Sequence, residues 1–542
     1  MSHKSFNRTM NKRYLRGRSF SFLLFFLLIS LAWSKTPVAD SALKGFEAIH
    51  AADMEIFLKF IASDELEGRN TGDRGLNIAA LFLESQYRLA GLTPAPGQDS
   101  MLQHFKVIKS KLLPQTSLTV LKGNSPKESF RVFQDFLLAS RHSVPVQLKA
   151  PFQFAGFAAK IDSATYDDFQ NLHAQGKIIV AFDGMPGSFS LKTDKKSGFN
   201  RAVRQQRRTK AKLAKEAGAA AILFISRSLT TKSMERVKRW LVRPSYRLTY
   251  DEEPIPQIII SERVAKKIFA KSKPSYKDVV AQMAATQRSL AVTFKMTQLQ
   301  IDIQVDTTTK MTQNVVAYLE GTDPQLKHEV VAFGAHYDHL GKSANGDIYN
   351  GADDDGSGTV SILEIARAFA HNPVRPKRSL IFVSHAGEER GLLGSRYYTD
   401  HPLVSLDSTV AQLNIDMIGR NEENSVYIIG SNFLSKELHN INETENEEIG
   451  LNLDYKYNNT DDPQRFYYRS DHYNYAKHGV PIIFYFTGTH ADYHQPTDTV
   501  DKINFHKMQK IARLVYLTGW EVANLDHQLS KDGLLIEKNS TQ

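Results

Sequence analysis

Histidines and carboxylates recur just beyond apolar runs in the second half of the sequence. The side chains that follow these runs are His336, Glu388 with Glu389, Asp416 and His494. If each run is a buried strand, the side chains meet in the crevice outside the carboxyl ends of a sheet. Imidazole and carboxylate donors without any cysteine are typical of a catalytic zinc site. The pattern therefore predicts metal-dependent hydrolytic chemistry.

Residues 351–358, GADDDGSG, place three aspartates side by side between glycines. A calcium loop would alternate its acidic residues, and a phosphate loop would carry a lysine, so neither pattern fits. Two readings remain open on this stretch alone. It is either an acidic cap for a helix that begins near Ser357, or a source of a carboxylate that bridges two cations.

The neighbouring motifs suggest different roles for their histidine and carboxylate side chains. In AHYDHLG, the carboxylate of Asp338 could orient the imidazole of His336. In GEERGLLGS, adjacent Glu388 and Glu389 point different ways, so one could act as a base while the other holds metal. An exposed glutamate pair in the first turn of a helix is the alternative for that motif.

These residues need a sheet to bring them together. From 296 to 530, short apolar runs alternate with helical patterns, which predicts an α/β fold with a mixed, largely parallel sheet flanked by helices. Residues 41–119 predict helices and an extended segment that complete this catalytic domain. Residues 120–295 have short strand-like runs and one strongly basic helix, which predicts an inserted, mostly-β domain.

The amino-terminal residues predict export. Residues 1–34 combine six basic residues, an apolar run too short to span a bilayer comfortably and a small-x-small ending, as in a cleaved signal peptide. Its removal lowers the net charge from +10 to +4, so charge gives no reason to expect a nucleic-acid partner. We expect a periplasmic or extracellular protein with no stable membrane insertion after cleavage. The basic stretch 191–218 is either a solvated helix face or a contact with an anionic cell envelope.

Five motifs in this order resemble the secreted co-catalytic zinc exopeptidases: GAHYDHLG, GADDDGSG, GEERGLLGS, NIDMIG and DYHQPTDT. That family includes bacterial leucyl aminopeptidases, aminopeptidase Y and glutamate carboxypeptidase. The insert resembles a protease-associated domain. The resemblance implies two zinc ions per chain. His336 and Asp416 would bind one ion, Glu389 and His494 the other, and Asp354 would bridge both.

The resemblance also implies the catalytic groups. Glu388 would take a proton from the attacking water and pass it to the leaving amine, and Tyr493 could donate to the oxyanion. A cis peptide between Asp354 and Asp355 is expected, with Ser470, Asp471 and His472 supporting the site.

Peptides or small proteins would be the substrates, and an aminopeptidase is the expected activity. A carboxypeptidase or dipeptidase, a one-zinc glutaminyl cyclase and a non-catalytic binding protein are the alternatives. The sequence leaves open the oligomeric state, the side-chain preference and the role of the insert.

Overall fold

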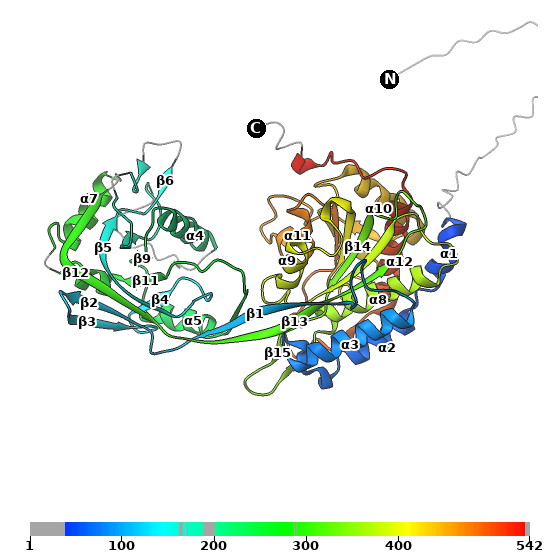
Figure 1. Cartoon of the computed structure of the whole chain (residues 1–542), viewed down its shortest axis with the longest axis horizontal. Coiled ribbons are helices and arrows are strands. Elements are labelled where there is room, and N and C mark those ends of the chain that lie inside the picture. The colour runs from blue at the N-terminus through cyan, green and yellow to red at the C-terminus, as the bar shows by residue number, and fades with distance from the viewer. Residues whose placement is uncertain are drawn as a thin grey trace, which may run out of the picture.

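The protein has two lobes joined by long strands, as Figure 1 shows. The computed structural model describes residues 38–161, 166–170, 172–187, 201–270, 272–286, 288 and 290–536. The predicted signal peptide, 1–34, and residues 191–200 of the basic stretch lie outside the described residues. Among the described helices, none has the length and apolar character needed to cross a membrane.

The larger lobe is built on a nine-stranded mixed sheet. Its order is β10 (Ser245–Leu248), β1 (Leu102–Leu112), β13 (Val305–Leu319), β17 (Ser379–His385), β14 (Val330–His336), β18 (Thr409–Ile415), β21 (Ile482–Phe486), β19 (Ser425–Ile429) and β20 (Asn452–Asp454). The central strands β17, β14, β18 and β21 run parallel to one another. All four are buried along their whole length, which explains their nearly continuous apolar sequences. The predicted α/β fold with a largely parallel core is confirmed.

Helices cover both faces of this sheet because successive strand side chains point to opposite sides. Val331, Phe333 and Ala335 of β14 pack into one core, whereas Val330 and Ala332 pack into the other. The first core is covered by α1 (Asp40–Glu47), α2 (Ala51–Ile61), α3 (Arg74–Leu89), α8 (Gly358–His371), α10 (Lys436–Ile449) and α12 (Phe505–Asn524). The second is covered by α9 (Leu393–Asp400) and α11 (His472–Ala476).

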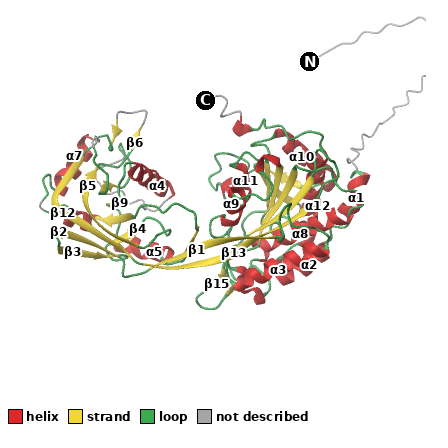
Figure 2. Ribbon diagram, in the orientation of Figure 1, coloured by secondary structure: helices red, strands yellow, loops and turns green. Residues whose placement is uncertain are grey.

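The smaller lobe has its own sheet and its own cores. Its eight strands are β3 (Ser125–Arg131), β2 (Ser117–Lys122), β12 (Ala291–Ile303), β5 (Val146–Ala155), β8 (Ile178–Phe182), β9 (Ala221–Ser226), β11 (Gln257–Ser261) and β4 (Phe136–Leu138). The helices of this lobe are α4 (Arg201–Glu216), α5 (Thr231–Leu241), α6 (Glu262–Ile268) and α7 (Tyr276–Thr286). Figure 2 shows α4, α5 and α7 in the same lobe as these strands. Separate buried apolar clusters fill this lobe.

Long strands connect the lobes. β1 pairs with β13 over its whole length, and β12 continues directly into β13. β10 lies within residues 120–295, the range expected for the insert, but it pairs with β1 of the larger sheet and not with a strand of the smaller sheet. Beyond β10, Asp251 forms a 2.7 Å ion pair with Arg396 of α9, and Tyr250 donates to Asp400 at 2.7 Å. The smaller lobe is therefore tied to the larger one by strand pairing and by polar contacts.

A buried arginine holds together the loops around the carboxyl ends of the strands. Arg69 lies in the turn between α2 and α3 and is fully buried. Its guanidinium donates to the carbonyls of Tyr337 at 2.8 Å, Asn350 at 2.6 Å and Gly351 at 3.0 Å. Those carbonyls flank β14 and the aspartate triplet, so the EGRNTG turn fixes the approach to both.

Replacing this arginine should destabilise the whole larger lobe. Arg69→Met leaves several buried carbonyls without a donor, and each such loss costs about 1–3 kcal/mol. We expect the free energy of unfolding, measured by chemical denaturation, to fall by about 3 kcal/mol or more. Arg74→Met, at an exposed neighbouring position, is the matched control. Equal stability of the two variants would contradict the role given to Arg69.

Candidate metal centre

The parallel strands deliver the predicted side chains to one edge of the larger sheet. β14 ends at His336, and Asp416 directly follows β18. Glu388 and Glu389 come shortly after β17, and His494 lies in the loop after β21. The structure thus brings together all five predicted metal ligands, which lie far apart in sequence.

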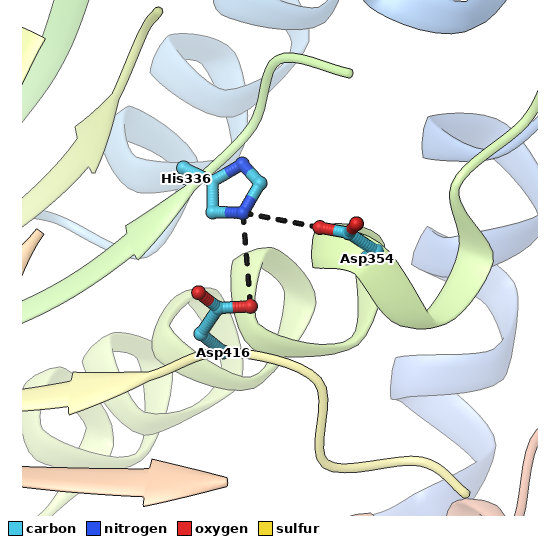
Figure 3. Close-up of side chains that lie close together, drawn as sticks. All are labelled: His336, Asp354 and Asp416. Carbon is cyan, nitrogen blue, oxygen red and sulfur yellow. Dashed lines mark ion pairs between the residues drawn. The ribbon is translucent and has the colours of Figure 1, made fainter. Parts of the chain in front are cut away.

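One group of ligand atoms gathers around the imidazole of His336. Its Nε2 lies 3.3 Å from Asp354 Oδ1 and 3.7 Å from Asp416 Oδ1, as the dashed lines of Figure 3 show. Glu388 Oε2 lies 3.8 Å from the same nitrogen. His336, Asp354 and Asp416 form one of the two described side-chain groups that could hold a metal ion.

A second group uses the other carboxylate oxygen of Asp354. Asp354 Oδ2 lies 3.1 Å from His494 Nε2, and Glu389 Oε1 lies 3.2 Å from that same nitrogen. His339 joins them, with its Nδ1 2.9 Å from Glu389 Oε1. Asp354 is therefore shared by both groups, one oxygen facing each.

Several of these atoms are buried without a hydrogen-bond partner among the described residues. They are His336 Nε2, His339 Nδ1, Asp354 Oδ2 and Glu389 Oε1. Buried polar atoms normally find partners, because leaving them unpaired is costly. Atoms of the metal-ligating type that face one another without partners are what a cation site requires, so the residues fit divalent cations.

The other two aspartates of the triplet hold backbone in place. Asp355 accepts hydrogen bonds from the backbone N–H groups of His336 at 3.1 Å, Gly358 at 2.8 Å and Met417 at 3.1 Å. Asp355 therefore connects the end of β14, the start of α8 and the segment after β18. Asp353 accepts from the N–H of Gly419 at 2.6 Å. The peptide between Asp354 and Asp355 is cis, as expected.

Close backbone packing explains the glycines that flank the triplet. Gly351 has a φ of 58°, in the left-handed region that favours glycine. A Cβ at Gly358 would collide with the carboxylate of Asp355 and the carbonyl of Ile415. The first turn of α8 can therefore approach β18 only without a side chain at that position.

The support for His336 differs from the H-x-D prediction. Its Nδ1 lies 3.1 Å from the backbone carbonyl of Asp338, whereas the carboxylate of Asp338 is 3.7 Å away. That carboxylate instead accepts from the N–H of Glu388 at 3.0 Å and from Thr71 Oγ1 at 2.8 Å. The chain turns directly after β14, which presents the Asp338 carbonyl to the ring and leaves the carboxylate for the glutamate loop.

Ser470 contacts Asp416, the predicted ligand that directly follows β18. Its hydroxyl donates to Asp416 Oδ2 at 2.6 Å and accepts from Asn414 at 3.1 Å. Asp471 and His472 are fully buried behind the site.

Burial and charge shape the acid–base properties of the cluster. Burial, and then the nearby charges of Glu389, Asp416 and Asp471, raise the pKa of Glu388 well above its usual value. Burial would lower the pKa of His494, but the nearby carboxylates of Asp354 and Glu389 raise it to about 10. Tyr493 stacks on His494 with ring centroids 3.9 Å apart. Burial and the same carboxylates raise the pKa of Tyr493, so its hydroxyl keeps its proton.

His339 is the residue at the centre that the sequence motifs do not assign. It is fully buried, and its ring lies edge-on to that of His494, with centroids 5.9 Å apart. The only signal for it in the sequence is its place three residues after His336, and a lone histidine in a turn is weak evidence. Only the fold shows that it faces Glu389.

Comparison with known proteins agrees with this geometry. Residues 314–518 match the model of peptidase family M28. A probable leucine aminopeptidase of Trichophyton verrucosum is 32% identical over 209 residues, which are 37% of this chain and 56% of that protein. Aminopeptidase YwaD of Bacillus subtilis is 27% identical over 225 residues, 40% of this chain and 45% of that protein. The chain thus spans about half the length of these relatives.

The solved structure of an aminopeptidase from Aneurinibacillus sp. strain AM-1 is similar to this one, with a TM-score of 0.51 and 16% sequence identity. The alignment covers 91% of this chain and 98% of that aminopeptidase chain. That likeness shows a shared fold. The matched segment contains every residue of the two ligand groups. Residues 314–518, which contain the candidate metal centre, are therefore similar to peptidase family M28.

Proposed function

We propose that this protein is a zinc-dependent exopeptidase that releases residues from the amino terminus of peptides. The observation that carries the proposal is the pair of ligand groups that share Asp354. The names of the relatives, a probable leucine aminopeptidase and an aminopeptidase, favour the amino end of the substrate over the carboxyl end.

Two zinc ions would occupy the centre. His336 and Asp416 would hold one, Glu389 and His494 the other, and Asp354 would contribute one oxygen to each. Zinc ions bound there would supply Lewis-acid polarisation of the peptide carbonyl. A glutaminyl cyclase needs only one ion, so the shared carboxylate favours the peptidase.

Glu388 is the group that moves protons in this proposal. Its carboxylate lies at the edge of the centre, and its raised pKa suits a group that takes a proton from water and returns it to the leaving amine. The protonated hydroxyl of Tyr493, on the ring stacked against His494, would donate to the oxyanion. Asp338 holds Glu388 in position through the glutamate's backbone N–H.

Residues 1–34 would direct export to the periplasm or the extracellular space, and residues 120–295 would form a protease-associated-like insert. Peptides or small proteins would be the substrates.

Glu388→Gln tests the proton-transfer role. The amide keeps the shape of the side chain but cannot accept the proton, so kcat on a leucyl peptide should fall by about 10²–10⁴-fold. Zinc content, measured by atomic emission, should remain unchanged. Glu423→Gln, at an exposed position, is the control. Wild-type kcat in Glu388→Gln would exclude this residue as the base.

The aspartate triplet gives an internal comparison. Asp354→Ala removes a carboxylate from both ligand groups, so the purified protein should lose its bound zinc. Asp353→Asn keeps an oxygen for the N–H of Gly419 and should retain about two ions per chain. Metal analysis after dialysis measures both. Two ions in Asp354→Ala would rule out the bridging role, and one ion in the wild type would favour the cyclase.

His339→Gln tests whether this histidine positions Glu389. Loss of the 2.9 Å contact should weaken binding of one zinc ion by about 10–100-fold and leave the other unaffected. Calorimetric titration of metal-stripped protein resolves the two affinities. His371→Gln, on the exposed end of α8, is the control. Two unchanged affinities would show that His339 has no part in the centre.

A further inference from the structure

A large cavity connects the candidate metal centre to the smaller lobe. Its volume is about 1310 Å³, and its lining includes Glu389 and His494 of the centre. Its lining also includes three residues from the smaller lobe: Arg141 after β4, Trp240 near the end of α5 and Arg243 just before β10. A substrate bound at the metal centre would therefore extend towards the smaller lobe.

The charges that line this cavity are mostly positive. Glu67 and Asp73 are already paired, with Lys342 and Lys310 respectively. By contrast, six lining cations have no carboxylate within ion-pair distance among the described residues: Arg74, Lys109, Lys111, Arg141, Arg243 and Arg390. Unpaired cations that converge on one cavity need an anion to offset their repulsion.

Two of these arginines are held in place by other contacts. Arg390 follows the predicted ligand Glu389, donates to the carbonyl of Leu340 at 3.1 Å and lies 5.2 Å from the ring centre of Tyr246. Arg141 lies 4.8 Å from the ring centre of Trp240, and its backbone carbonyl accepts from Ser245 of β10 at 2.9 Å. Since β10 pairs with the larger sheet, Arg141 has a fixed position relative to the metal centre.

Positively charged side chains around the cavity lie close enough to affect one another's pKa values. After burial, the positive charges of Arg390 and Arg243 lower the pKa of Arg141. Burial, and then the nearby charges of Arg465 and Arg469 of the larger lobe, lower the pKa of Arg201 of α4. Both lobes thus present arginines to the space between them.

We propose that this cavity receives the part of the substrate beyond the scissile bond and selects acidic peptides. Aspartate or glutamate side chains of the peptide would pair with Arg141, Arg243 and Arg390, whose planar guanidinium groups suit carboxylates. The inference rests on the proposed peptidase function and assigns a role to the smaller lobe, which supplies two of the three arginines.

A peptide fits better than a nucleic acid. Tyr246 is buried, and Arg141 already lies over Trp240, so neither ring is free to stack on a base. The cavity also leads directly to the candidate peptidase centre, which a peptide must reach to be cleaved.

The test compares three amidated peptides with the same leucyl amino terminus and the same scissile bond: Leu-Ala-Glu-Glu-Gly, Leu-Ala-Gln-Gln-Gly and Leu-Ala-Lys-Lys-Gly. We expect kcat/KM for the Glu peptide to exceed that for the Gln peptide by about tenfold, mainly through KM, with the Lys peptide slowest. The advantage should shrink as salt rises from about 0.02 M to about 0.5 M. In the double variant Arg141→Gln with Arg243→Gln, the Glu-to-Gln ratio should fall towards one.

Lys127→Gln with Arg131→Gln, two exposed changes on β3 at the edge of the smaller sheet, is the matched control and should keep the full ratio. Hydrolysis of all three peptides at equal rates would overturn the inference and leave the proposed function intact. Tighter binding of a single-stranded oligonucleotide of equal charge would also overturn it.

A binding measurement distinguishes the peptidase proposal from the cavity proposal. Fluorescence anisotropy would measure the binding of a labelled Glu-rich peptide whose amino terminus is blocked. Binding that is lost in the double variant, with no hydrolysis of any peptide, would refute the peptidase proposal and support the proposal that the cavity binds acidic peptides. If the peptide does not bind and the Glu and Gln peptides are hydrolysed at equal rates, the cavity proposal is refuted.

Discussion

The repulsion among buried carboxylates is the constraint on which the rest of the structure depends. Asp354, Glu388, Glu389 and Asp416 converge on the carboxyl ends of the parallel strands, where little water can screen them. Imidazoles offset part of this repulsion, as the raised pKa of His494 shows. Two divalent cations would offset it far more fully. The proposed activity follows from the same arrangement, because groups that can hold two cations can also activate water.

The fold supplies the rigidity that such a cluster needs. Asp355 receives three backbone N–H groups and so connects two strand ends to the start of α8. Arg69 does the same by donating to the carbonyls of Tyr337, Asn350 and Gly351, beside β14 and the aspartate triplet. These two side chains carry no chemistry in the proposal, yet each one fixes the loops that present the ligands.

The sequence predicts much of this and misses specific parts for physical reasons. The apolar runs predict β14, β17, β18 and β21 because fully buried parallel strands have nearly continuous apolar sequences. The motifs predict the five ligands, which the fold brings together. The role of His339 is not predictable because its contact with Glu389 is tertiary. For the same reason, the sequence suggests the carboxylate of Asp338 as the support for His336, where the structure shows its carbonyl. The pairing of β10 with β1 is equally non-local, so the fixed position of Arg141 could not be foreseen.

In the proposed centre, one carboxylate, Asp354, is shared by two cations. Anomalous diffraction from crystals grown with zinc measures this most directly. We expect two zinc peaks about 3.5–4 Å apart, one beside His336 and Asp416 and one beside Glu389 and His494, with Asp354 between them. A single peak, or a second peak that does not contact Asp354, would contradict the shared role of Asp354.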